Sequence, residues 1–308
     1  MTTYHRGEVA VQNRAGLREP AEFSRGALGN TVPDVAAAFL AEQPFVILGA
    51  ADLTGRLWAT QLTGAPGFLR APQPQVLTLD ALPFPEDPLA DALTGPASSA
   101  VPVRTGMIAI EPATRRRMRM NGRALRQGAG LRVELDQVVA NCPKYLQKRS
   151  RQAPALRSAP HTRTATDGTA LTPAQQQTVT TADTFFIATA SLQGDADASH
   201  RGGNPGFVEV LSPTLLRWPD YTGNSMFLTL GNLAVNPAAG LVFPNWETGS
   251  LLHLSGTART DWDTRASAPI PGAQRLVEFT VEAVREISHA SPLRWSAPTY
   301  SRFNPPTR

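Results

Sequence analysis

Residues 184–208 read TFFIATASLQGDADASHRGGNPGFV, and residues 45–69 read FVILGAADLTGRLWATQLTGAPGFL. The two segments align without a gap at an offset of 139 positions, 184 − 45. Both contain an apolar run, a glycine turn and a Gly-x-Pro-Gly-Phe sequence, but they differ in between. The second segment has Ser199-His200-Arg201 where the first has Thr60-Gln61-Leu62. A duplicated scaffold with polar residues in only one copy predicts one working site and one supporting half.

The repeat continues downstream at an offset of 134 positions, 240 − 106, which aligns Gly106 with Gly240. Short apolar or alternating runs bounded by turn residues predict strands. In the first half these are residues 45–50, 57–60, 105–110, 117–125 and 131–139. In the second half they are residues 185–191, 196–200, 215–218, 240–243, 251–259 and 277–287. Many short, closely spaced strands predict a mainly β protein with an antiparallel barrel in each half.

Composition shifts suggest the boundaries between these units. Residues 1–33 have little periodicity and are interpreted as an arm, and residues 34–42 (DVAAAFLAE) predict a helix. Residues 150–173 are rich in Ala, Pro, Thr and Arg, which is typical of a linker. The prediction is a first barrel at 34–149, a linker at 150–182, a second barrel at 183–290 and a tail at 291–308.

The overall composition, 42% hydrophobic and 18% charged residues, is that of a folded protein. No apolar run is long enough to cross a membrane, and the N-terminus lacks a signal-peptide core, so we expect a cytoplasmic protein with no membrane partner. The single Cys142 excludes an internal disulfide and a cysteine metal cage, and we expect no metal site. Cys142 is either a reactive thiol or a small semi-buried residue at a strand-to-helix junction, and the second interpretation is favoured.

The net charge of +4 comes from 29 basic and 25 acidic residues. The basic residues are mostly scattered, with clusters at Arg115–Arg117 plus Arg119 and at Lys144–Arg151. Short clusters of this kind are typical of solvated faces, so no nucleic-acid partner is predicted.

Chemistry-bearing residues gather in the second copy. Ser199, His200 and Arg201 precede the flexible pair Gly202-Gly203, and an arginine fork beside accessible backbone suits a phosphate. A polar turn, PDYTGN at 219–224, follows, and then a short element that puts Thr229 and Asn232 one turn apart if it is helical. His200 is the candidate catalytic residue; a structural histidine is the alternative.

The run FFIATAS…DASHRGGNPGFV…PDYTGNSMFLTLGNLAVNPAAGLVF…LLHLSGTAR resembles the pyridoxamine 5′-phosphate oxidase-like, FMN-binding split-barrel proteins. Within that superfamily it is most similar to the tandem flavin-nucleotide-binding group. The first half shares the pattern through WATQLTGAPGF and NCPKYLQKR, and the ending PLRW…YSRFNPP is also similar. The resemblance therefore covers nearly the whole chain.

This resemblance implies two tandem, six-stranded split β-barrels that form a pseudo-dimer with FMN at their interface. Ser199, His200, Arg201 and Gly202 would meet the flavin. Asn224 and Thr229 would close over the phosphate with Asn232 nearby, and Trp218 would lie near the isoalloxazine ring. The chain departs from the oxidase in TGNSMFLTLGN, which has no lysine, and the oxidase's C-terminal Trp and Arg signature is not evident. Vitamin B6 oxidation is therefore not predicted.

The leading functional hypothesis is an FMN-dependent oxidoreductase of unknown substrate, in which the flavin carries the redox chemistry. Alternatives are a reductase that uses the deazaflavin F420, or a non-enzymatic flavin or haem carrier or sensor. Expected partners are a small-molecule substrate and a separate electron-donor reductase, and a homodimer is an alternative arrangement. The first barrel is expected to bind no flavin, because Leu62 cannot hold a phosphate and LPFP at 82–85 would break the covering helix. Trp58 and Gln61 are the residues expected to reach across.

Overall fold

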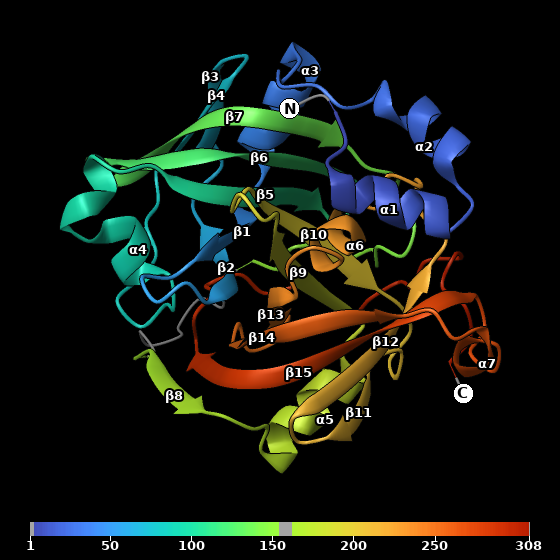
Figure 1. The fold of residues 1–308 in the computed structure, drawn as a ribbon. Helices are drawn as coiled ribbons and strands as arrows, with labels where there is room; N and C mark the ends of the chain where they lie inside the picture. The colour runs from blue at the N-terminus through green and yellow to red at the C-terminus, as the bar shows by residue number, and fades with distance from the viewer. Residues whose placement is uncertain (1–2, 154–161, 308) are drawn as a thin grey trace.

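Two antiparallel sheets with the same strand order form the computed structural model, which describes residues 3–153 and 162–307 (Figure 1). The first runs β2-β1-β5-β6-β7-β4-β3 and the second β10-β9-β13-β14-β15-β12-β11. The first-half strands are β1 (Phe45–Ala51), β2 (Leu57–Thr63), β3 (Leu69–Gln73), β4 (Val76–Leu79), β5 (Val103–Glu111), β6 (Arg116–Gln127) and β7 (Gly130–Ala140). The second-half strands are β9 (Thr184–Ala190), β10 (Ala196–Gly202), β11 (Glu209–Ser212), β12 (Leu215–Tyr221), β13 (Ala238–Pro244), β14 (Leu251–Asp261) and β15 (Ala273–Ser288). The orders match position for position, so the predicted mainly β fold of two tandem split barrels is confirmed.

Local details repeat as well. The β1–β2 and β9–β10 hairpins turn at Gly55 and Gly194, whose φ angles of 87° and 85° favour glycine. The register between β6 and β7 shifts between Asn121 and Gly122, and the register between β14 and β15 shifts at the equivalent place, between Ser255 and Gly256. Each sheet has seven strands along its path, one more than the implied six, and the β3–β4 and β11–β12 hairpins lie at the end of each path.

The two halves pack against each other as a pseudo-dimer. β5 lies on β10, and the equivalent β13 lies on β2. A Cβ atom at Gly106 would overlap the backbone of Asp197, and one at Gly240 would overlap the backbone of Trp58. Asp197 and Trp58 are themselves equivalent in the repeat, so the contact is self-complementary, as in a twofold dimer. The repeated glycines therefore mark where two backbones must approach closely.

Three large apolar clusters within the described residues stabilise this arrangement. Each barrel has its own core, with Leu48, Met107 and Met120 in the first and Phe185, Trp218 and Phe279 in the second. The third cluster joins the halves through side chains from both, including Phe45, Ile47, Ile108, Phe186 and Val242. The barrels therefore share a continuous apolar interface.

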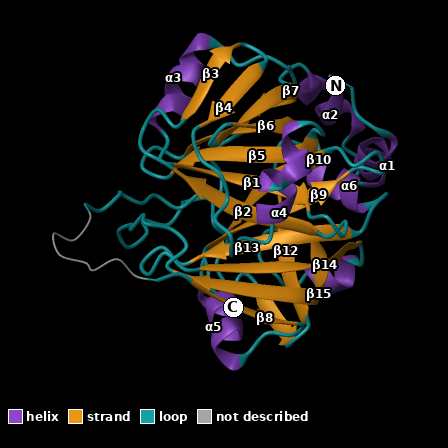
Figure 2. Ribbon diagram, turned by 90° about the vertical axis from the view of Figure 1, so that its left-hand side faces the viewer, coloured by secondary structure: helices purple, strands orange, loops and turns teal. Residues whose placement is uncertain are grey.

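The arm, expected to be irregular, contains α1 (Arg6–Arg14) and α2 (Arg18–Arg25). α1 begins at a capping box formed by His5 and Glu8, and it packs against α6 (Leu228–Leu233) in the second half (Figures 1 and 2). A Cβ at Gly7 would overlap the carbonyl oxygen of Gly231, so this helix pair depends on close backbone contact. Gly29 also pairs with Val138 of β7, so residues 3–33, which we call the strap, contact both halves.

The remaining elements lie between or beside the barrels. The helix α3 (Asp34–Glu42) lies where it was predicted. The predicted linker contains β8 (Thr164–Gly168), which pairs with β15, and α5 (Pro173–Thr181), while its residues 154–161 lie outside the described residues. Short helices complete the fold: α4 (Ala90–Thr94), the 3-10 turn η1 (Pro96–Ser99) and α7 (Thr264–Ser267). Within the described residues, no helix has the length and apolar character that spanning a membrane requires.

Candidate functional site

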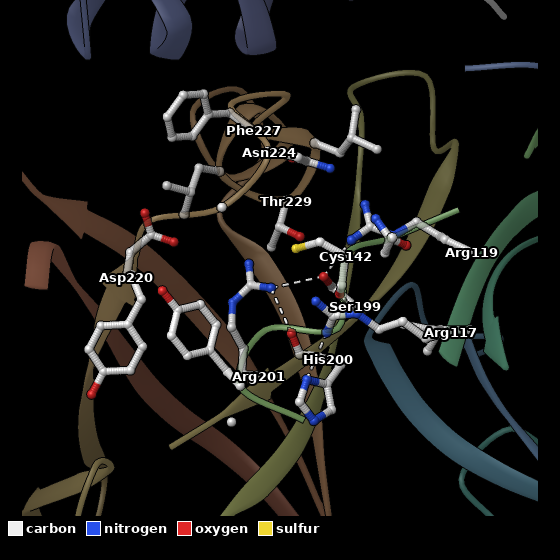
Figure 3. A pocket seen from close by; sticks show the side chains of 18 of the residues that line it. Arg117, Arg119, Cys142, Ser199, His200, Arg201, Asp220, Asn224, Phe227 and Thr229 are labelled. Atoms are coloured by element: carbon white, nitrogen blue, oxygen red, sulfur yellow. Dashed lines mark hydrogen bonds between the residues drawn. The ribbon is translucent and has the colours of Figure 1, made fainter. Parts of the chain in front are cut away.

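A cleft opens where the two barrels meet, and both halves supply its walls (Figure 3). The first half contributes β6 and the segment after β7. The second half contributes β10, the end of β12, and α6 with the loop before it. The polar lining residues are Arg117, Arg119, Asn141, Cys142, Tyr145, Ser199, His200, Arg201, Asp220, Tyr221, Asn224, Ser225 and Thr229.

Strand alternation brings the polar groups together. On β10, Ser199 and Arg201 are two residues apart and point to one face, as do Arg117 and Arg119 on β6. The Ser199 hydroxyl accepts a hydrogen bond of 2.5 Å from Arg119 and one of 2.8 Å from Arg201. One serine oxygen therefore ties a guanidinium from each half to the base of the cleft.

The positive charge at this point is only partly compensated. Arg119 is 8% exposed and forms a 3.0 Å ion pair with Asp197. Among the described residues, neither Arg117 nor Arg201 forms an ion pair within 4.0 Å. Burial is the main cause that lowers the pKa of Arg201, and burial lowers the pKa of Arg117 to about 10. Both groups remain cations at neutral pH, in surroundings that make an unpaired charge costly.

Asp220 is the acid on the opposite wall. Its carboxylate lies 3.4 Å from Arg275, whose guanidinium also stacks 4.9 Å from the ring centre of Phe227. Burial raises the pKa of Asp220, while the charges of Arg201 and Arg275 act against that shift. Asp220 therefore offsets the arginines only in part, and the cleft stays net positive.

His200 is a neutral imidazole at one end of the arginine group. Burial, followed by the charges of Arg117 and Arg201, lowers the pKa of His200 well below its usual value. Arg117 donates a 2.9 Å hydrogen bond to Nδ1, so the proton of the neutral ring must lie on Nε2. His200, held in one uncharged tautomer, thus orients the guanidinium of Arg117 in the cleft. This contact fits a positioning role for His200.

The cleft's rim contains backbone held in an unusual conformation. Tyr145, Ser225 and Phe227 have φ angles of 64°, 62° and 58°, in the left-handed region that non-glycine residues avoid. Such strain gathers at binding sites when the surroundings enforce it. Here the strap helps enforce it, because Gln12 donates to the Met226 carbonyl and Ser24 donates to the Asn224 carbonyl, at 3.0 and 2.8 Å.

An aromatic pair lies at the mouth of the cleft. The rings of Tyr145, from the first half, and Tyr221, from the second, are 5.1 Å apart at an interplanar angle of 35°. The Tyr145 hydroxyl donates a 3.0 Å hydrogen bond to the Thr222 carbonyl. The rings offer two apolar faces in the same cleft as the arginines, a combination suited to a ligand with both an anionic and an aromatic part.

The structure brings together six of the eight residues predicted to bind the ligand. Ser199, His200, Arg201, Gly202, Asn224 and Thr229 all line the cleft. Trp218 instead packs in the second barrel's core against Phe185, with ring centres 5.0 Å apart. Asn232 faces away from the cleft and bonds Thr189 and His5, both at 3.0 Å. Among the described residues, no group of three His, Cys, Asp or Glu side chains could hold a metal ion.

Sequence reasoning missed the first half's contribution. Trp58 and Gln61 were expected to reach the cleft, but Trp58 donates to Asp52 at 2.9 Å and neither residue lines it. Arg117 and Arg119 enter it instead, so the solvated-face interpretation of that arginine cluster is wrong for them. The alternation of Arg117, Arg119 and Asn121 with Met118 and Met120 was the available signal, because it separates a polar face from a core face.

Cys142 also lines the cleft, partly buried, in the segment after β7. No helix follows it, so the expected strand-to-helix junction is absent from this described segment. Its carbonyl accepts a 2.9 Å hydrogen bond from Arg117, which fixes the arginine's position. The backbone of Cys142 thus takes part in the site.

The equivalent place in the first half is closed. Thr60, the counterpart of Ser199, donates a short hydrogen bond to the buried Asp87 and lies 3.4 Å from His253 Nε2. Leu62, the counterpart of Arg201, is 2% exposed in the first barrel's core. The space that is open beside β10 is filled by the chain itself beside β2.

No protein-family model matches the chain, and the search of curated proteins found no match. A FAD-binding protein from Mycobacterium smegmatis is 13% identical with a TM-score of 0.28, covering 39% of this chain and 98% of that chain. HupZ from Group A Streptococcus is 12% identical with a TM-score of 0.31, covering 36% and 90%. A protein described as a candidate pyridoxamine 5′-phosphate oxidase from Lactobacillus delbrueckii is 18% identical with a TM-score of 0.33, covering 38% and 94%. Likenesses of this degree carry no argument about function, so the cleft's function is inferred from its own side chains.

Proposed function

We propose that the cleft binds a flavin mononucleotide by its phosphate, and that the protein is an FMN-dependent oxidoreductase. The observation that carries the proposal is the pair of partly buried guanidiniums, Arg117 and Arg201, that form no ion pair among the described residues. A phosphate would supply the missing negative charge and accept charge-assisted hydrogen bonds. The resemblance stated above supports a flavin over other phosphorylated ligands.

The residues fit such a group in kind and in position. Arg201 and Arg117 would hold the phosphate, with the hydroxyls of Ser199 and Thr229 beside them. The Tyr145–Tyr221 pair would present its apolar surface to the ring system. Bound flavin would supply hydride or electron transfer, and the protein would bind it, orient it and exclude water.

Protonation in the cleft favours binding over acid–base chemistry. His200 is neutral, and its Nδ1 is occupied by Arg117. Asp220 faces Arg201 and Arg275, so its role is to orient the guanidiniums. The chain therefore needs no catalytic acid of its own for the proposed reaction, since the redox step belongs to the cofactor.

Titration of the apoprotein with FMN tests the proposal, with one flavin per chain expected. Arg201→Ala should weaken binding by about 1.5–3 kcal/mol, or roughly 10- to 150-fold, the range for a hydrogen bond to a charged group. Arg56→Ala is the matched control, because Arg56 is an exposed arginine in the β1–β2 turn. A wild-type protein that binds no FMN, or equal affinities for the two variants, would refute the proposal.

A further inference from the structure

A second cavity lies beneath the strap, on the far side of Asp197 from the cleft. It encloses about 320 Å³, within the size range of small-ligand sites. Its wall combines the strap, the first barrel and the second barrel, through Glu8, Asn121 and Asp197 respectively. The same strand faces line both sites, because β6 continues from Arg119 to Asn121 and β10 from Ser199 back to Asp197. We infer that this cavity binds a small organic ammonium compound.

The charges of the wall exclude an anion as its preferred ligand. Arg104 forms an ion pair with Asp195, and Arg123 forms one of 3.1 Å with Asp136. Asp197 is satisfied by Arg119 at 3.0 Å. Each arginine that lines the cavity therefore has a carboxylate partner. Among the described acidic residues of the lining, Glu8 is the one without an arginine partner. A cation would therefore find a carboxyl group, whereas an anion would find only neutralised arginines.

Glu8 is buried, 5% exposed, at the start of α1. One of its oxygens accepts a 2.7 Å hydrogen bond from the His5 amide, and the other lies 3.7 Å from His5 Nε2. That nitrogen is 3.0 Å from the side-chain oxygen of Asn232, and Nδ1 accepts from the Gly7 amide, so the ring is neutral with its proton on Nε2. His5 therefore brings no positive charge to the carboxyl group.

A second acceptor lies on the first-barrel wall. The side-chain nitrogen of Asn121 donates to Gln137 at 3.1 Å and to Asp197 at 3.2 Å. Its side-chain oxygen is buried without a partner among the described residues. A buried acceptor without a donor is rare in folded proteins, and an N–H group of a ligand that reached this oxygen would satisfy it. Asn121 thus favours a hydrogen-bond donor, and the carboxyl group of Glu8 favours a donor with positive charge.

An organic cation suits the cavity better than a metal ion. The described residues contain no cluster of three His, Cys, Asp or Glu groups with the spacing a metal needs. The wall also includes Leu228 and Ala196, which would contact the carbon skeleton of a ligand. A compound with one ammonium group on an apolar body matches this lining.

Binding of an ammonium compound should displace the proton of Glu8, which can be measured. Burial, the main cause, raises the pKa of Glu8 to about 8; Asp197 adds to the shift, while the His5 amide and Arg119 oppose it. Glu8 is thus mainly protonated at pH 7, and a bound ammonium group would favour its ionised form. Binding should therefore release up to one proton to the buffer.

Benzylammonium is the probe, with benzoate and benzyl alcohol as its anionic and neutral counterparts. Isothermal titration at pH 7 in phosphate and in Tris should show binding of benzylammonium with an enthalpy that depends on the buffer. Glu8→Gln should weaken it about tenfold or more and abolish the buffer dependence. Glutamine also suits this capping position, so the helix start is preserved. Glu19→Gln, at an exposed position in α2, is the matched control.

The inference fails if benzylammonium does not bind, if benzyl alcohol binds as tightly, if benzoate displaces bound benzylammonium, or if Glu8→Gln and Glu19→Gln behave alike. FMN titration of Glu8→Gln separates this inference from the proposed function. That variant should bind flavin as the wild type does, because Glu8 does not line the cleft. Loss of ammonium binding with flavin affinity retained would support an independent second site.

Discussion

The hairpins β1–β2 and β9–β10 share register and turn, yet within the described residues the cleft lies beside the second and the matching place beside the first is filled. The difference comes from what fills the space beside each hairpin. Next to Thr60, the segment between β4 and β5 inserts the carboxylate of Asp87. Next to Ser199, the guanidiniums of Arg119 and Arg201 converge. On the proposed function, the phosphate of the ligand supplies the negative charge there. A duplicated fold can therefore lose a site without changing its strands, when the chain supplies an internal group in place of the ligand.

The largest test of this comparison is Leu62→Arg, which copies Arg201 into the first half. Leu62 is 2% exposed, so the variant buries a charge in an apolar core and should destabilise the protein by more than about 4 kcal/mol. Denaturant unfolding measures the change. Leu53→Arg, at a turn position that is 76% exposed, should stay within about 0.5 kcal/mol of wild type. A Leu62→Arg protein that is fully stable and binds a second flavin would show that the first site is merely unoccupied rather than filled.

The second test uses pH and Asp87. Burial raises the pKa of this carboxyl to about 6 from 3.8, although bonds from Thr60 and Leu89 and the charge of Arg285 oppose the shift. The folded state thus holds the proton more tightly than the unfolded state. The resulting stability is fully present below about pH 4 and is lost as the pH rises through 6, by about 3 kcal/mol in all.

Unfolding free energies at pH 4 and pH 7 check this expectation, with Asp87→Asn as the reference that cannot titrate. Wild type should lose about 2 kcal/mol more than Asp87→Asn over this interval, because part of the effect falls below pH 4. Glu8 titrates in both proteins, so its contribution cancels in the difference. Parallel pH profiles would mean that Asp87 is not the internal anion that closes the first site.

The sequence was sufficient to predict the frame of the molecule. Apolar alternation and paired glycines located most strands, because a strand buried on one face must alternate and close backbone contacts require glycine. The same logic extends to Arg117 and Arg119, whose alternation with methionines marks a polar face of β6. The local pattern of β10 likewise predicted Ser199 and Arg201 as neighbours in one site.

Long-range placement was beyond sequence reasoning. α1 has few apolar residues, and its position depends on contact with α6, which follows it by more than two hundred residues in the chain. Asp87 lies in a proline-rich segment, and nothing local shows that its carboxylate reaches Thr60. Trp218 precedes a site-lining turn, yet strand alternation turns its ring into the barrel core. Each of these depends on tertiary packing.

The test with the smallest expected effect removes each of the two equivalent hydroxyls in turn. Ser199→Ala removes the acceptor shared by Arg119 and Arg201, so FMN affinity should fall by about 1–2 kcal/mol. Thr60→Val removes the hydrogen bond to Asp87, so stability should fall by about 1–2 kcal/mol at pH 7 while flavin affinity stays within about twofold of wild type. Flavin titration and denaturant unfolding of both variants give the four values. If Thr60→Val weakens flavin binding as much as Ser199→Ala, the two halves share the ligand, and the contrast between a filled and an open site is wrong.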